Sequence, residues 1–140
     1  MPVFVYPNSQ NSAILAAEIL EHAALPTPIL WDHTCLDRTI RDLVQVDKQT
    51  SWSMPTASDI DMNVQRTGIT DPVILFYGVD VPTIKDVIRD LKDRKQWPLL
   101  AVVTKSSLDM TLSCLIAHLL DDRAKELAVK EQRSKRASNG

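Results

Sequence analysis

The sequence predicts a single α/β domain of two or three layers, in which two βαβα halves share a mostly parallel four-stranded sheet. Four short apolar runs rich in β-branched and aromatic residues alternate with longer stretches whose apolar residues recur at helical spacing. Strands alternating with helices of this length are typical of βαβ units with right-handed crossovers. A chain of 140 residues with 44% hydrophobic residues suffices for one such domain.

The first half is expected over residues 1–46. It contains a buried strand at 3–6, which Pro7 ends, and then a helix over 12–24, a segment rich in good helix formers. A second strand follows at 29–31. The next helix is expected to begin near Thr34, because one apolar stripe then follows at helical spacing. That stripe consists of Leu36, Ile40, Leu43 and Val44.

The second half is expected over residues 72–128. It begins with the strand 73–77, and Pro82 suits the first turn of the helix that follows. A fourth strand covers 99–103 and leads into a long last helix. The apolar face of that helix consists of Leu108, Leu112, Leu115, Ile116, Leu119 and Leu120. Between the halves, residues 47–71 hold no sustained period and are interpreted as a polar, partly ordered connector, and the tail 129–140 is expected to be frayed or disordered.

A short motif recurs 72 residues apart. Leu36-Asp37-Arg38-Thr39-Ile40 matches Leu108-Asp109-Met110-Thr111-Leu112, which indicates either an internal duplication or a chance match of a common pattern. Each copy also follows a capping-box signature, Thr34-x-x-Asp37 and Ser106-x-x-Asp109, in which hydroxyl and carboxylate would satisfy free N–H groups at a helix start. This structural role argues against the two aspartates as an acid–base pair.

The second half resembles an uncharacterised bacterial family, the domain of unknown function 3783. The similarity lies in the strand that ends at Gly78 and in Leu100-Ala101-Val102-Val103-Thr104. The chain departs from the family at Leu100, where a Lys is usual, and at Ser107 and Met110, where Asn and Trp are usual. The resemblance implies an α/β fold and a bacterial, cytosolic origin, and it implies no activity.

Charge and composition exclude several classes of function. A net charge of -2 gives no reason to expect a nucleic-acid partner, and no apolar run approaches the ~20 residues of a membrane span. The N-terminus has no signal-peptide pattern, so we expect a cytoplasmic protein with reduced cysteines. The two cysteines and three histidines are scattered singly, and we expect neither a metal site nor a cofactor.

Polar residues follow each predicted strand, where open parallel sheets bind ligands. The candidate anion-binding residues are Asn8, Ser9, Asp32, His33, Thr104, Lys105, Ser106 and Ser107. Residues 104–107 combine hydroxyls, an ammonium group and a helix start, although helix caps and a solvated lysine are the favoured explanation of these residues. With only three glycines and no glycine-rich loop, close wrapping of a nucleotide phosphate is disfavoured.

No catalytic residue emerges from the sequence. Trp52 and Met54 in the connector are candidate anchors for a partner, or they fold the connector onto the domain, and Trp97 is a third large apolar residue outside the stripes. The leading hypothesis is a non-catalytic binding or regulatory module with an unknown protein partner or with a second copy, acting through the connector or the last helix. The alternatives are an anion- or nucleotide-binding domain with its site near Thr104 and Lys105, or an enzyme of unfamiliar type.

Overall fold

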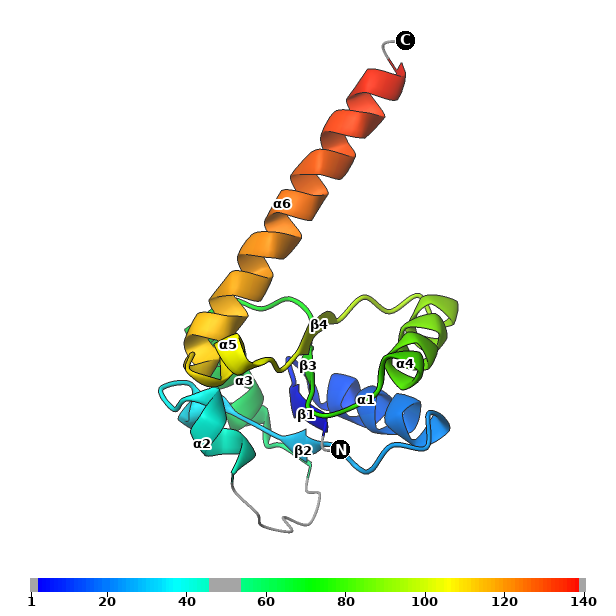
Figure 1. Ribbon diagram of the computed structural model, residues 1–140. Coiled ribbons are helices and arrows are strands. Elements are labelled where there is room, and N and C mark those ends of the chain that lie inside the picture. Colours follow the sequence, from blue (N-terminus) through cyan, green and yellow to red (C-terminus); the bar gives the residue numbers. More distant parts are fainter. Residues whose placement is uncertain (1–2, 46–53, 139–140) are drawn as a thin grey trace.

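The computed structural model describes the backbone of residues 3–45 and 54–138, and the side chains of these ranges up to residue 128. Four strands form one sheet in the order β2-β1-β3-β4 (Figure 1). The strands are β1 (Val3–Tyr6), β2 (Ile29–Leu30), β3 (Val73–Phe76) and β4 (Leu99–Val102). Both outer pairings are parallel, whereas β1 and β3 run antiparallel at the centre. The predicted α/β domain with a mostly parallel four-stranded sheet is confirmed.

Two crossover helices cover one face of the sheet. α1 (Gln10–His22) connects β1 to β2, and α4 (Val81–Asp93) connects β3 to β4, with Pro82 in its first turn as expected. Ser9 caps α1 by accepting the N–H of Ser12 at 3.0 Å. Alternate residues of the strands meet these helices in a buried cluster. That cluster contains Val3, Val5, Ala16, Ile19, Leu20, Ile74, Phe76, Val79, Val87 and Leu91.

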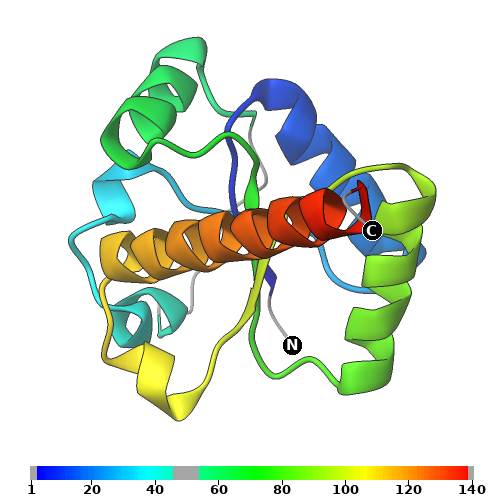
Figure 2. The same ribbon diagram turned by 90° about the horizontal axis from the view of Figure 1, so that it is seen from above.

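Five helical elements cover the opposite face of the sheet, so the domain has three layers (Figure 2). They are η1 (His33–Cys35), α2 (Ile40–Val44), α3 (Ala57–Thr67), α5 (Lys105–Leu108) and α6 (Leu112–Ser138). The remaining strand residues pack against them, and the ring of Phe4 stacks on Trp31 with 4.2 Å between centroids. Both faces of the sheet are therefore buried, which explains why β1 and β3 are apolar at every position.

The two predicted capping boxes are wrong, because each helix begins later than expected. The helix expected near Thr34 is divided into η1 and α2, and α2 is capped by Thr39, whose hydroxyl accepts the N–H of Asp42 at 3.2 Å. Likewise, α6 starts after Thr111, whose hydroxyl accepts the N–H of Cys114 at 3.1 Å. The caps thus lie within the repeated motif itself.

The carboxylates of the supposed boxes form ion pairs instead. Asp109 accepts a hydrogen bond from Arg41 at 2.9 Å, and Asp37 lies 3.7 Å from Arg66. Each carboxylate therefore connects two segments that lie far apart in the sequence. The structural roles of the two aspartates therefore differ from the predicted ones.

The late helix starts have a physical cause in a contact between the repeated motifs. Thr39 and Thr111 form an antiparallel bridge, in which the N–H of Ile40 donates to Met110 O at 2.8 Å and the N–H of Leu112 donates to Arg38 O at 3.0 Å. Extended backbone is required on both sides of this bridge, so neither helix can begin before it. The two hydrogen bonds are reciprocal, and each joins residues at matching positions of the motifs.

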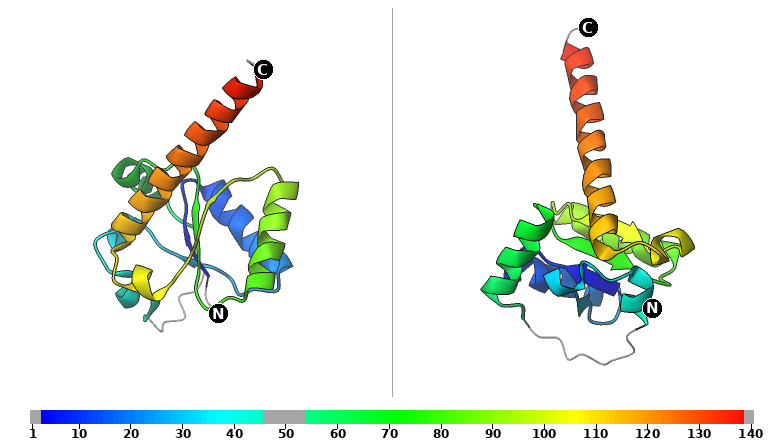
Figure 3. Two further views of the ribbon diagram at one scale, coloured as in Figure 1. Left: turned by 45° about the horizontal axis from the view of Figure 1, so that its top comes forward. Right: turned by 90° about the vertical axis from the view of Figure 1, so that its left-hand side faces the viewer.

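The connector and the tail are more regular than expected. Within 47–71 the chain forms α3, which Thr56 caps and which ends at Gly68 with φ of 74°. Residues 46–53, and with them Trp52, lie outside the described residues. The tail was expected to be frayed, but α6 continues to Ser138 and leaves the body of the domain (Figures 1 and 3). Within the described part of the chain, no helix is both long and apolar enough to cross a bilayer.

Removing the Thr111 cap tests the reassigned helix starts. We expect Thr111→Ala to lower the free energy of unfolding by about 1 kcal/mol, because an N–H at the start of α6 loses its acceptor. Ser106→Ala is the matched control: Ser106 is exposed and lies inside α5, so its loss should change stability by less than about 0.5 kcal/mol. Urea unfolding of both variants measures the loss of stability. A larger loss for Ser106→Ala than for Thr111→Ala would indicate that Ser106 is the cap, as the sequence predicts.

Candidate functional site

At the carboxyl ends of β1 and β2, where a parallel sheet ordinarily offers a ligand site, α3 supplies a buried side chain. Asn63 has no solvent exposure. Its Oδ1 accepts the N–H of His33 at 2.8 Å, and its Nδ2 donates to Pro7 O at 3.1 Å. Since Pro7 directly follows β1 and His33 lies just after β2, one amide bridges the ends of both strands. The chain itself occupies this position.

Further contacts fix α3 around the same residue. The hydroxyls of Tyr6 and Thr67 both donate to Asn63 O, at 3.1 and 2.7 Å. Burial raises the pKa of Tyr6 to about 12, and its interaction with Thr67 offsets only part of that increase. Arg66 donates to His33 O at 3.0 Å, which attaches the outer side of α3 to the segment after β2. We call Tyr6, His33, Asn63, Arg66 and Thr67 the α3 clamp.

Four of the predicted anion-binding residues lie at this edge, and each has a structural partner for at least one polar group. The side chain of Asn8 donates to Thr70 O at 2.7 Å, and Ser9 caps α1. Asp32 caps η1 by accepting the N–H of Thr34 at 2.9 Å, and it also accepts the hydroxyl of Thr34. The ring of His33 lies 3.5 Å from Asp59 of α3. Sequence reasoning found this edge but assigned it to a ligand instead of to α3.

The other four predicted residues lie at the opposite edge, because β3 and β4 run antiparallel to β1. Thr104 and Ser107 bond to each other: the N–H of Thr104 donates to Ser107 Oγ at 2.6 Å, and the N–H of Ser107 donates to Thr104 Oγ1 at 3.3 Å. Lys105 and Ser106 are exposed. The helix that these residues start, α5, has only 4 residues. The structure therefore divides the eight candidates into two separate groups and does not assemble them.

A crevice of about 290 Å³ lies between α1 and α4, beside Asn8 and Ser9. Its floor is apolar, with Ile19, Ile74 and Leu91, and no Lys or Arg lines it. The buried Oδ1 of Asn8 has no hydrogen-bond partner among the described residues. Ligand pockets usually begin near 300 Å³, so the crevice has room for a fragment-sized molecule at most. Its lining offers no counter-charge for a phosphate group.

A second hollow, of about 330 Å³, lies between α4 and the base of α6. Arg123 of α6 closes one side of it and donates to Trp97 O at 3.2 Å and to Pro98 O at 3.0 Å. Arg123 also lies 3.6 Å from the carboxylate of Asp71. The Trp97 side chain lines both hollows and is 58% exposed. Arg123 thereby fixes the point at which α6 leaves the body.

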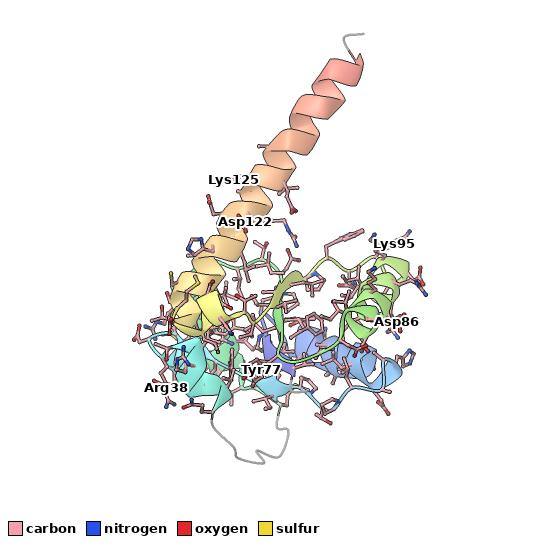
Figure 4. All side chains as sticks on the ribbon, viewed as in Figure 1. Arg38, Tyr77, Asp86, Lys95, Asp122 and Lys125 are labelled. Carbon is pink, nitrogen blue, oxygen red and sulfur yellow. The ribbon has the colours of Figure 1, made fainter. Side chains whose placement is uncertain are left out.

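Beyond Arg123, α6 extends away from the body, although Glu126 still lines the hollow, and we call residues 124–138 the stalk (Figures 1 and 3). Figure 4 shows Asp122 and Lys125 where the helix departs from the body. Residues 124–128 are all exposed, and Leu127 retains 54% of its accessible surface. The only ion pair in the described part of the stalk joins Lys125 to Asp121, one turn earlier, at 3.0 Å.

The described residues offer no catalytic constellation. Among them, no three His, Cys, Asp or Glu side chains gather in a group that could hold a metal ion. Cys35 is half-buried, Cys114 is exposed, and both are free thiols. Of the two predicted partner anchors, Met54 is 39% exposed, and Trp52 lies outside the described residues.

The sequence did not predict the roles of two residues: Asn63, which holds α3 at the strand ends, and Arg123, which holds the base of α6. Asn63 is one amide residue in a polar segment, and no pattern in the neighbouring residues predicts that it is completely buried. Arg123 lies in a run of charges that is typical of a solvated helix. Comparison of the chain with protein-family models, with curated proteins and with solved structures gives no match. The function must therefore be inferred from the geometry alone.

Replacing Asn63 tests the α3 clamp. We expect Asn63→Ala to lower the free energy of unfolding by about 2–4 kcal/mol, because it leaves the part-buried His33 N–H and the buried Pro7 O without their partner. Met62→Ala is the matched control, since Met62 precedes it on α3 and is 37% exposed; it should cost less than about 1 kcal/mol. Urea unfolding gives both values, and equal losses would contradict a bridging role for the amide.

The buried Tyr6 phenol predicts a loss of stability at high pH. Its pKa is about 12 in the folded protein, whereas the ordinary value of a tyrosine, expected in the unfolded chain, is 10.0. The contribution of the neutral phenol to folding stability is therefore complete below pH 10 and is lost as the pH rises toward 12. Tyr6→Phe removes the ionisable hydroxyl and with it this dependence of stability on pH. The stability advantage of the natural protein over the variant should fall by about 1.4 kcal/mol from near pH 9 to near pH 11. Urea unfolding at both pH values measures it, and a constant difference would show that the phenol ionises without unfolding.

Proposed function

We propose that the protein is a non-catalytic binding module whose interaction surface is the stalk, together with the hollow at its base. The observation that carries this proposal is the exposure of the stalk: residues 124–128 are exposed, among them Leu127 at 54%. Helices in proteins are stabilised mainly by packing of an apolar face, and isolated helices of this length are marginal in water. A helix held out from the domain in this way is well suited to receive a partner.

The α3 clamp and the anchoring of α6 support the choice of the stalk over the connector. The connector was the other candidate surface, but its α3 is engaged in hydrogen bonds at the strand ends. Arg123 fixes the direction in which the stalk leaves the body, and a fixed direction lowers the entropic cost of binding. A cytosolic location belongs to the same proposal, since Cys35 and Cys114 are free thiols.

The alternative, an anion- or nucleotide-binding domain with its site near Thr104 and Lys105, has weaker support. Its favourable feature is an exposed ammonium group beside the start of α5. However, the hydroxyls of Thr104 and Ser107 are occupied with the α5 cap. The polar residues after β1 and β2, which would have completed the site, lie at the other edge of the sheet. We therefore favour the stalk.

Site-specific photo-crosslinking in the cells that make the protein tests this proposal. A photoreactive residue at Leu127 should give a covalent adduct with another polypeptide chain, identified by mass spectrometry. The same residue at Arg89 is the control, because Arg89 is 76% exposed on α4, away from the stalk. No adduct at position 127 beyond that at position 89 would exclude the stalk as an interaction surface.

A further inference from the structure

We propose that the outer edge of β4 binds an extended segment of another polypeptide as a fifth strand, in the hollow at the base of the stalk. This inference rests on the proposed function, because the hollow is part of the proposed interaction surface. It specifies what enters the hollow: a segment in strand conformation that carries apolar side chains and a basic one.

The outer edge of β4 presents backbone groups that the sheet does not use. The N–H groups of Leu99 and Val103 donate to carbonyls in and just before β3, at 2.9 and 2.8 Å. Alternate residues of a strand turn their N–H and C=O groups to opposite sides, so those of Leu100 and Val102 point away from β3. Among the described residues, no hydrogen bond reaches these groups. Such an edge is a template for a further strand.

The strand lacks the features that usually prevent pairing at an edge. Those features are charged side chains, prolines, bulges and a very short strand. β4 consists of Leu, Leu, Ala and Val, and its four residues pair with β3 in an unbroken register. The side chain of Val102 is 49% exposed. The strand at the other edge of the sheet, β2, has only 2 residues, so β4 is the edge that offers the longer template.

The walls of the hollow favour a single extended chain as the occupant. Leu100 of β4 lines the hollow, Ile88 and Leu91 of α4 border it on one side, and Leu119 and Arg123 of α6 border it on the other (Figure 1). A second copy that paired through its own β4 would bring its own α4 and α6 against these two helices. A separate segment has no helices beside it and enters between them.

Side chains around the hollow indicate the chemistry of that segment. Trp97 is 58% exposed, and tryptophan is enriched among the residues that dominate binding energy. Asp122 and Glu126 line the side toward the stalk, whereas Lys92 lines the side toward α4. Arg123 is already engaged with backbone carbonyls. The two carboxylates therefore favour a segment with a basic side chain on the side of the stalk.

Peptide selection on the full-length protein tests the inference. The probe is a phage-displayed library of random ten-residue peptides, and the enriched peptides should alternate apolar residues and include Lys or Arg. Fluorescence anisotropy of a labelled synthetic copy measures its Kd. N-methylation of one peptide amide at a time should weaken binding roughly tenfold at alternate residues and little at those between, because only every second N–H faces β4. A helical peptide would be affected at consecutive residues.

A variant of the strand edge provides the second test. Val102→Pro removes an outward N–H without removing a hydrogen bond to β3, and proline is tolerated at such positions of edge strands. Val102→Ala is the matched control, since it keeps the N–H and shortens the same side chain. We expect roughly tenfold weaker peptide binding for Val102→Pro and less than about threefold for Val102→Ala. Circular dichroism checks the fold, and if Val102→Pro fails to fold, the N-methylation pattern decides.

The outcomes separate this inference from the proposed function. It is overturned if no peptide is enriched, if N-methylation acts at consecutive residues, or if folded Val102→Pro binds as the natural protein does. A dimer of the natural protein that Val102→Pro dissociates in sedimentation velocity also overturns it, because a second copy then occupies the edge. A specific adduct at Leu127 without an enriched peptide leaves the stalk as the interaction surface and removes only the fifth strand. If both experiments fail, both proposals fall.

Discussion

The antiparallel pairing of β1 with β3 is the constraint on which the rest of this domain depends. Each outer strand runs parallel to its inner neighbour, so each half is a βαβ unit with a helical crossover. When two such units meet through antiparallel inner strands, their crossover helices, α1 and α4, lie on one face of the sheet. The other face is left to segments outside those units. The same pairing sends the strand ends of the two halves to opposite edges.

Because the strand ends are divided, the polar residues that follow the four strands do not share one crevice. In a wholly parallel sheet the polar residues after every strand would converge on one crevice. Here they form two smaller groups, and the group after β1 and β2 is covered by α3 through Asn63. Burying an amide without partners costs several kcal/mol, so its hydrogen bonds specify one position of α3. Helix α3 of the connector is therefore held in place by the strand ends and belongs to the packed domain.

Several elements could be predicted because their determinants are local. The apolar runs at β1 and β3, the helix formers of α1 and Pro82 in α4 all act within a few residues. The direction of β3 relative to β1 could not be predicted from the sequence, because it depends on contacts between distant segments. Helix α3 was missed for a related reason: only Ile60 and Asn63 of its residues are buried, too few to give an apolar stripe.

The candidate site was predicted in part, and its errors share one cause. Residues 8, 9, 32 and 33 were correctly placed at strand ends, but the partners of Asn8 and His33 lie thirty or more residues away, at Thr70 and at Asn63 of α3. The repeated motif was recognised, whereas the cap within it depends on a bridge between Thr39 and Thr111. That bridge joins positions 72 residues apart through reciprocal hydrogen bonds. The contact joins the two copies of the motif at matching positions.

Asymmetry between the halves is as informative as their likeness. The helix after the first bridge, α2, has 5 residues, whereas its counterpart α6 has 27. α6 packs against the core as far as Leu120, whereas its next described residues, up to Ala128, add no apolar side chain to the core. Arg123 nevertheless holds the base of that extra length to the backbone before β4. The hydrogen bonds of Arg123 therefore orient a helix that extends past the core, and this geometry is the one on which the proposed interaction of the stalk rests.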